Sequence, residues 1–358
     1  MSDVYERLRE RLDDLSVGYP ATGSGVEIRI LKRLFTEEEA ELFMKLSQLP
    51  EPPKQVAERT ARDEAHTAEL MERMAAKGLL FRLRKGETVS YGAVPFLVGI
   101  LEHQVKRIYP EIAVEFDEYF ESGFGKSVQS VKTPLMRSIP INRQVALKWP
   151  VAPYEDVLGI IEQQKVIALA PCICRTWKKT LGEGCDKPME TCFTFGQHAH
   201  YYVENHMARY ITKEEAVEIV KRNDEAGLVM QPFNSQKVGG MCSCCGDCCG
   251  MLRSLKKQPA PAKAVQSNYF AEVDASSCAG CETCVDRCQM EAIRMVDDKA
   301  VVDLDRCIGC GLCVTTCTTE AMQLKRKPDE QIYEPPKTGA ETYLRIAIER
   351  GKNLAPRE

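Results

Sequence analysis

The sequence predicts an α+β protein built from several domains. Its 358 residues exceed the usual size of one domain, apolar residues recur at both helical and strand spacings, and 17 cysteines fall in two regions separated by a Pro- and Ala-rich stretch. We expect, in chain order, an N-terminal helix and linker (1–25), a domain of helices and a hairpin (26–95), a helical connector (96–149), a Cys-rich α/β domain (150–257), a linker (258–270), a second Cys-rich domain (271–327), and an extended segment with a helix (328–358).

Charge and composition exclude several classes of protein. The formal net charge is −4, which gives no electrostatic case for binding nucleic acid or a membrane. The apolar runs are too short to span a bilayer, and the charged N-terminus shows no secretory leader. An odd number of clustered cysteines argues against a disulfide framework. We therefore expect a cytoplasmic protein from a reducing, anaerobic cell.

The N-terminal region shows a regular alternation of predicted elements. Residues 1–20 predict a short amphipathic helix, and alternating apolar and charged residues predict a strand over Val26–Phe35. Thr36 to Glu39 form a capping box that opens a helix. Helices over 54–58 and 63–77 and a hairpin around Gly86-Glu87 follow.

This order of helices and a hairpin resembles a winged helix-turn-helix. The predicted recognition helix, 63–77, carries Asp63, Glu64, Glu69 and Glu72 against only Arg73 and Lys77. Phosphate contacts need a basic face, so this charge pattern favours a protein-docking module over a DNA-binding one. After it, Pro95–Gly125 predicts one helix bent at Pro110, and Lys126–Trp149 an irregular connector.

The middle domain places its cysteines around predicted secondary structure. Helices are expected over 153–164, 195–209 and 212–227, and strands over 166–170 and 228–231. The first strand runs into Cys172 and Cys174, and Cys185 and Cys192 follow. A second group contains Cys242, Cys244, Cys245, Cys248 and Cys249.

Metal ligation explains these nine cysteines better than packing does. Neighbouring cysteines cannot all point into one core, so the usual interpretation of a buried structural cysteine fails here. We expect one or two iron–sulfur clusters, with the first four cysteines as one pool of ligands and the last five as another, although ligands could be shared between the pools. Arg175, Lys178 and Lys179 would offset the negative charge and raise the potential. His198, His200 and His206 lie at helical spacing and favour a helix surface over ligation.

The second Cys-rich domain contains one motif twice. Cys278, Cys281, Cys284 and Cys288 follow the spacing C-x2-C-x2-C-x3-C, and Cys307, Cys310, Cys313 and Cys317 repeat it. This segment resembles a bacterial two-cluster ferredoxin domain, and zinc sites are the weaker alternative because they usually use separated C-x2-C pairs. The resemblance implies that Cys278, Cys281, Cys284 and Cys317 hold one [4Fe–4S] cluster, and that Cys307, Cys310, Cys313 and Cys288 hold the other. Gln289 and Thr318 replace the Pro that follows the fourth Cys in that family.

The middle stretch also resembles a segment found beside dicluster ferredoxin domains in anaerobic bacterial 4Fe–4S binding proteins. The matching pieces are Ala170–Arg175 and Cys242–Gly250. The paired cysteines are similar to those of the heterodisulfide reductase family, but the spacing differs and no residue role is transferred.

The sequence predicts an iron–sulfur electron-transfer protein that works with redox partner proteins, or as a subunit of a larger anaerobic oxidoreductase. Two alternatives stay open: a redox-sensing winged-helix regulator, and an oxidoreductase with a special catalytic cluster at Cys242–Cys249. Whether the chain is itself an enzyme is left undecided. No nucleotide-binding or hydrolytic motif is present in the sequence.

Overall fold

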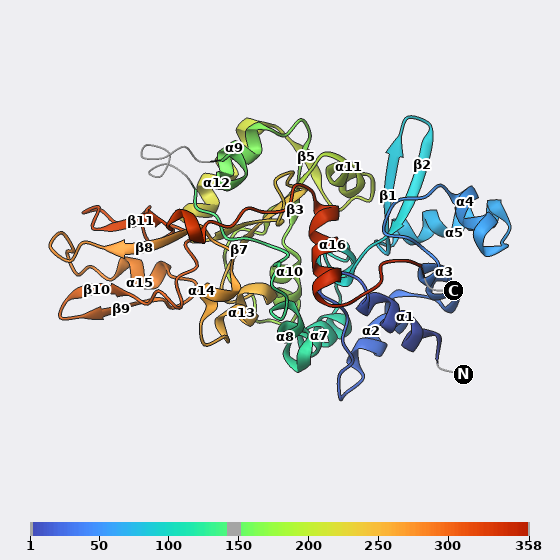
Figure 1. Ribbon diagram of the computed structural model, residues 1–358, viewed down its shortest axis with the longest axis horizontal. Helices are drawn as coiled ribbons and strands as arrows, with labels where there is room; N and C mark the ends of the chain where they lie inside the picture. Colours follow the sequence, from blue (N-terminus) through green and yellow to red (C-terminus); the bar gives the residue numbers. More distant parts are fainter. Residues whose placement is uncertain (1–2, 142–151, 357–358) are drawn as a thin grey trace.

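The computed structural model describes residues 3–141 and 152–356. Helices and strands both contribute to it, which confirms the α+β class. The helical N-terminal region lies at one end, a sheet with flanking helices lies in the middle, and the small strands of the second Cys-rich domain lie at the other end (Figure 1). The predicted boundary between 149 and 150 lies outside the described residues, as does Trp149.

The N-terminal region keeps most of the predicted elements. It contains α1 (Val4–Asp13), α2 (Val26–Leu34), α3 (Glu37–Met44), α4 (Pro53–Thr60), α5 (Glu64–Ala76), β1 (Leu80–Lys85) and β2 (Thr88–Ala93). The capping box at Thr36 is present, with Glu39 bonded back to the Thr36 backbone. β1 and β2 pair antiparallel, from Leu80 opposite Ala93 to Lys85 opposite Thr88. These findings confirm the capped helix and the hairpin.

The predicted strand over Val26–Phe35 is wrong, because this segment is helix α2. Val26, Ile30 and Leu31 lie on one helical face and are buried there. Glu27 in the first turn and Lys32 and Arg33 in the last turn complement the helix dipole. The strand that would begin a winged helix is therefore absent from this segment, and the winged-helix resemblance stays a prediction.

The connector is a series of short helical pieces, so the single helix predicted over 95–125 is wrong. The pieces are η1 (Phe96–Ile100), α6 (Leu101–His103), α7 (Pro110–Tyr119), η2 (Phe120–Phe124) and α8 (Gly125–Val128). The backbone leaves the helical region at Leu97, Val98 and Gly123, with φ 56° at Val98. Pro110 begins α7 at its first turn, where its missing N–H costs nothing.

The middle domain is built on a five-stranded antiparallel sheet with strand order β5-β3-β4-β7-β6. Its elements are η3 (Pro153–Glu155), α9 (Val157–Glu162), β3 (Ile167–Pro171), α10 (Ile173–Thr180), β4 (Glu190–Phe195), α11 (Gly196–Glu204), β5 (Arg209–Ile211), α12 (Lys213–Glu225), β6 (Val229–Pro232), β7 (Gly240–Cys244) and α13 (Gly250–Lys256). The predicted strands near 166–170 and 228–231 and the helix after Thr212 are confirmed.

Two predicted helices of this domain are shorter than expected. The helix predicted over 153–164 is divided, because the Asp156 side chain caps a new helix start at α9. The helical region predicted over 195–209 ends at Glu204, and β5 begins at Arg209. The sequence analysis also did not predict β4, β5 or β7.

The two faces of the sheet differ in chemistry. Side chains alternate between faces along each strand. Leu169, Phe193 and Met241 point to one face, where they pack with apolar residues of α9 and α12. On the opposite face Ala170 is opposite Cys192, and Cys192 is opposite Cys242. The sheet therefore separates an apolar core from a face of small residues and thiols.

The C-terminal region contains two small antiparallel pairs, β8 with β11 and β9 with β10. Its elements are α14 (Pro261–Ala264), β8 (Tyr269–Val273), α15 (Thr283–Arg287), β9 (Ile293–Val296), β10 (Lys299–Val302), β11 (Met322–Arg326), η4 (Asp329–Gln331) and α16 (Gly339–Glu349). The predicted linker over 258–270 includes the helical turn α14, and β8 already begins at Tyr269.

The chain's last segment returns across the molecule to the N-terminal helices (Figure 1). Ile346 of α16 is fully buried in the N-terminal core. The buried Arg11 guanidinium donates to the backbone oxygens of Leu46 (3.0 Å) and Ala355 (2.9 Å). Lys352 forms an ion pair with Asp13 at 2.7 Å. Helix α16 thus packs on the body of the protein.

Trp177 of α10 joins the middle domain to this N-terminal core. Its side chain is fully buried against the rings of Phe116 and Phe120. We expect Trp177→Ala to lower the free energy of unfolding by about 3–5 kcal/mol, because it leaves a large cavity. Leu49→Ala is the control, since Leu49 is 70% exposed and should change stability by less than about 0.5 kcal/mol. Anaerobic urea unfolding followed by far-UV circular dichroism measures both, and equal losses would contradict the prediction.

Candidate metal centres

The eight cysteines of the repeated motif line two cavities. The outer cavity contains Cys278, Cys281, Cys284 and Cys317, and the inner cavity contains Cys288, Cys307, Cys310 and Cys313. Each cavity takes three thiols from one motif and the fourth thiol from the other. The grouping is the one that the ferredoxin resemblance implies for the ligands, and ligation itself stays a prediction.

Backbone N–H groups point at the sulfurs of both cavities in a repeated pattern. The first cysteine of each motif accepts from a strand: Ala300 donates to Cys278 Sγ (3.5 Å), and Ala271 donates to Cys307 Sγ (3.4 Å). The fourth cysteines, Cys288 and Cys317, accept N–H groups from residues four or five positions later, at 3.2 and 3.3 Å. Such donors stabilise anionic sulfur and tune the potential of a bound cluster.

Glycines make room for the two cysteine loops. Gly280 and Gly309 both have positive φ, at 70° and 63°. A Cβ on Gly280 would lie 2.6 Å from the Asp298 carbonyl oxygen, and one on Gly309 would overlap the Tyr269 carbonyl oxygen. Any other residue at these positions would push the loop off its strand and open the cavity.

Six thiols of the middle domain converge on the thiol face of the sheet. They belong to Cys172, Cys174, Cys192, Cys242, Cys244 and Cys249, and we call them the six-thiol group. Cys192 and Cys242 are cross-strand neighbours, and Cys244 lies two residues further on the same face. Cys172 and Cys249 are the N-caps of α10 and α13. These helix starts and strand ends bring together residues that are far apart in the sequence.

The chemistry of the six-thiol group fits a polynuclear metal cluster. The hydrogen bond with Cys192 and burial raise the pKa of Cys242 well above its usual value, and the hydrogen bond with Cys242 and burial do the same for Cys244. Thiols this crowded cannot all ionise unless a cation lies among them. Bound iron would supply that charge and deprotonate the ligands. Six donors exceed the four that one cubane cluster needs.

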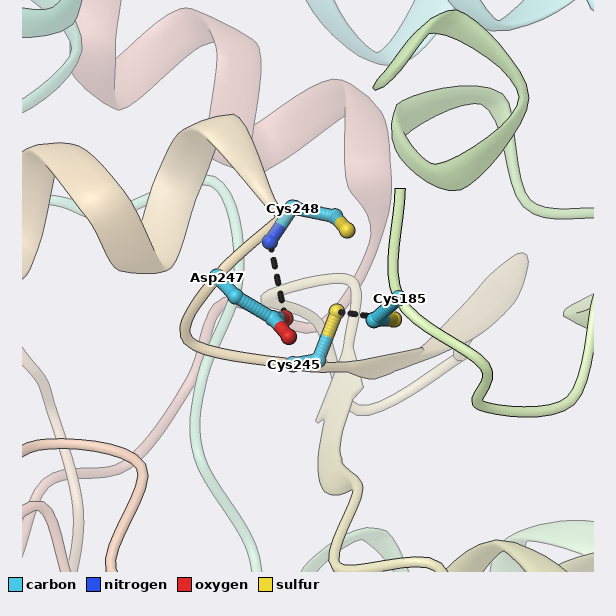
Figure 2. A group of neighbouring side chains, drawn as sticks. All are labelled: Cys185, Cys245, Asp247 and Cys248. Carbon is cyan, nitrogen blue, oxygen red and sulfur yellow. Dashed lines mark hydrogen bonds between the residues drawn. The ribbon is translucent and has the colours of Figure 1, made fainter. Parts of the chain in front are cut away.

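A second group in the same domain contains the other three thiols. Ligand atoms of Cys185, Cys245, Asp247 and Cys248 all lie within 4.8 Å of one another (Figure 2). Cys185 comes from the segment between α10 and β4, and the other three come from the turn between β7 and α13. The thiols are not grouped as the two pools expected from chain order, because Cys185 lies with Cys245 and Cys248 while the other three early cysteines lie in the six-thiol group. This mixing agrees with the alternative in which the pools share ligands, and ligation itself stays a prediction.

Arg175 lies between the two groups and is almost fully buried. It donates to Cys245 Sγ (3.5 Å), to the Ser243 carbonyl oxygen (3.1 Å) and to the Thr191 hydroxyl. Burial opposes its charge, yet the thiols of Cys172, Cys245 and Cys244 hold its pKa above the usual range. A hydrogen bond from Cys248, with help from the Arg175 charge, lowers the pKa of Cys245 to about 6.

The other two predicted cations do not share this role. Lys178 is buried but forms ion pairs with Asp117 (2.8 Å) and Glu183 (2.7 Å), which neutralise it. Lys179 is exposed. The three histidines have other surroundings: the His198 ring lies 4.8 Å from the Phe81 ring, His200 is hydrogen-bonded to the Tyr210 hydroxyl, and His206 is exposed.

The six-thiol group and the inner cavity adjoin one apolar cluster. Cys244 and Cys249 are buried in it with Met290, Ile308 and Leu312, and Cys288 and Cys307 pack against it. Gln289, at the position where ferredoxins have Pro, accepts a 2.7 Å hydrogen bond from the Gly246 N–H. The substitution thus serves the contact between the two domains.

Comparison with known families identifies one part of the chain. A family model described as a 4Fe–4S dicluster domain matches residues 262–328. No curated protein and no solved structure matches the chain. The match confirms the iron–sulfur character of the second Cys-rich domain. Within residues 3–141 and 152–356, no helix is both long and apolar enough to cross a bilayer.

Proposed function

We propose that this protein transfers single electrons through two [4Fe–4S] clusters in the dicluster domain and a third iron–sulfur cluster at the six-thiol group. The observation that carries the proposal is the apolar cluster shared by the inner-cavity cysteines and by Cys244 and Cys249. Iron–sulfur clusters accept and return one electron each. The outer cavity adjoins the inner cavity, and the inner cavity adjoins the six-thiol group. Clusters bound in this order would pass electrons from one to the next.

Exposure of the cysteines favours one end of this series as the docking end. Cys281 of the outer cavity is exposed, whereas Cys244 and Cys249 of the six-thiol group are buried. A partner protein can therefore approach the outer cavity more closely than the buried thiols of Cys244 and Cys249. We propose a one-electron redox protein, or a larger oxidoreductase, as the partner at this end.

The contacts of the β1–β2 hairpin give little support to the alternative function, a redox-sensing regulator that binds DNA. Arg82 forms ion pairs with Glu72 (2.6 Å) and with Glu204 of α11 (2.8 Å). Arg84 bonds to the same Glu204 at 3.1 Å. Arg82 and Arg84 thus hold the hairpin on the middle domain, which favours a structural role for them over contacts with DNA phosphates.

A catalytic cluster is the second candidate, and one observation favours it. Six thiols converge where a cubane cluster needs four, so a cluster of another type, with a reactive iron, could bind there. Such an enzyme would act on a thiol, a disulfide or a small ligand of iron.

Iron and acid-labile sulfide in anaerobically purified protein test the proposal. We expect about twelve iron atoms per chain, from three clusters of four. About eight would restrict iron to the dicluster domain and contradict the third cluster. A reductive titration followed by electron paramagnetic resonance (EPR) then separates the two candidates. Ordinary reduced-cubane signals support the carrier, and a signal that changes on adding thiol supports the enzyme.

A further inference from the structure

We propose that Cys185, Cys245, Cys248 and Asp247 bind a single divalent metal ion of the zinc type, apart from the iron–sulfur clusters. The four ligand atoms lie within 4.8 Å of one another, and the sulfurs of Cys185 and Cys245 are 3.9 Å apart. Figure 2 shows the Asp247 carboxylate and the Cys245 sulfur turned into the space between the turn and Cys185. We call this set the Cys3Asp site.

The spacing of the sulfurs favours one ion over a cluster. Four ligands placed tetrahedrally about 2.3 Å from zinc lie about 3.8 Å from one another. The observed 3.9 Å between the Cys185 and Cys245 sulfurs agrees with this value. The thiolates of a cubane cluster each bind a different iron atom and are spread much wider. The Cys3Asp site is therefore too compact for a cubane.

The ligand types favour zinc among single ions. Thiolates select soft or borderline metals, and three thiolates with one carboxylate complete a tetrahedron without an open position. One Asp247 oxygen accepts the N–H of Cys248 at 2.9 Å, which orients the carboxylate. Arg175 donates to Cys245 Sγ from the other side and offsets the excess negative charge of the ligands. A closed site of this kind is structural, because it leaves no position for a substrate.

The location of the site explains what the ion would do. Cys185 lies on the segment between α10 and β4, and the other three ligands lie on the turn between β7 and α13. Cys245 and Cys248 are fully buried, and Asp247 is exposed, so an ion can enter from the Asp247 side. Bound metal would join the segment that follows the C-terminal end of α10 to the turn that precedes α13. The inference does not depend on the electron-transfer proposal.

Metal content of the full-length protein, purified anaerobically, tests the Cys3Asp site. We expect about one zinc per chain in the wild type. Cys185→Ser and Cys248→Ser should lose the zinc and keep the iron, whereas the double variant Cys242→Ser/Cys244→Ser should lose iron and keep the zinc. Asp186→Ala, next to Cys185 but outside the set, is the matched control and should keep both metals.

Two further measurements test the site even if the cysteine variants fail to fold. Zinc-edge X-ray absorption of the wild type should show three sulfur ligands and one oxygen ligand. Asp247→Ala should weaken zinc binding by at least about 10-fold in competition with a chelator, because losing a ligand should cost no less than losing a residue that only orients one. The inference is overturned if the wild type holds no zinc, whether or not mass spectrometry finds a Cys245–Cys248 disulfide. It is also overturned if Cys248→Ser removes iron and leaves zinc in place.

Discussion

Replacing Cys242 and Cys244 together with serine is expected to remove about a third of the iron, from about twelve to about eight atoms per chain. The two cysteines lie on one face of β7, and Cys242 is directly opposite Cys192 of β4. Removing both cysteines takes away the centre of the six-thiol group. The double variant is used because the two thiols beyond the four that a cubane cluster needs could compensate for a single replacement. Iron analysis with EPR measures the loss, and the signals of the dicluster domain should remain.

Met241→Leu is the matched control for this variant. Met241 lies between Gly240 and Cys242 on the same strand but points to the apolar face. A near-isosteric change there should cost less than about 1.5 kcal/mol and leave the iron content unchanged. Loss of all iron in the cysteine double variant would show that the dicluster domain depends on the middle domain to fold. Unchanged iron in that variant would contradict a cluster at the six-thiol group.

The dicluster domain was predictable because its chemistry is local. Each motif places four cysteines within eleven residues, so a short loop and the turn after it decide where the sulfurs point. The crossed grouping of Cys288 and Cys317 was implied by the ferredoxin resemblance, and the lining of the two cavities agrees with it. Here the structure adds the N–H donors and the role of Gln289, which depends on contact with Gly246 of another domain.

The six-thiol group could not be grouped from the sequence, because its members meet only through the sheet. Cys192 and Cys242 become neighbours through the register of β4 and β7, and a shift of one residue would turn either side chain to the other face. Neither strand was predicted. The run Gly240–Cys244 contains Gly, Ser and Cys, which carry little strand signal. Chain order was therefore a poor guide to which thiols lie together in the structure.

Helix α2 was mispredicted as a strand because its pattern of apolar residues fits both kinds of secondary structure. Val26, Ile28 and Ile30 alternate with charged residues as in a strand, while Val26, Ile30 and Leu31 also fit one helical face. The two-residue period of a strand and the 3.6-residue period of a helix both fit so short a segment, and tertiary packing decides which structure forms. Contacts of α2 with α1 and α7 bury the helical face, so the helix forms.

Replacing Arg175 with methionine is expected to shift the potential of the middle-domain cluster to more negative values by on the order of 100 mV. Two unit charges at a separation of about 5 Å interact by roughly 3 kcal/mol at an effective dielectric constant of 20, which sets the scale of the expected effect. For a one-electron couple this energy is about 140 mV. The reduced cluster carries the more negative charge, so losing the cation destabilises the reduced form most. EPR-monitored titration measures the shift.

Lys178→Met is the control that separates charge from burial. Lys178 is buried on the same helix, but Asp117 and Glu183 already neutralise its charge. We therefore expect this variant to change the potential little, even where it lowers stability. Arg175→Lys keeps the charge and should return the potential toward the wild-type value, provided that the iron content is unchanged. Equal shifts in Arg175→Met and Lys178→Met would contradict a direct effect of the Arg175 charge, because a general disturbance of α10 would then account for both.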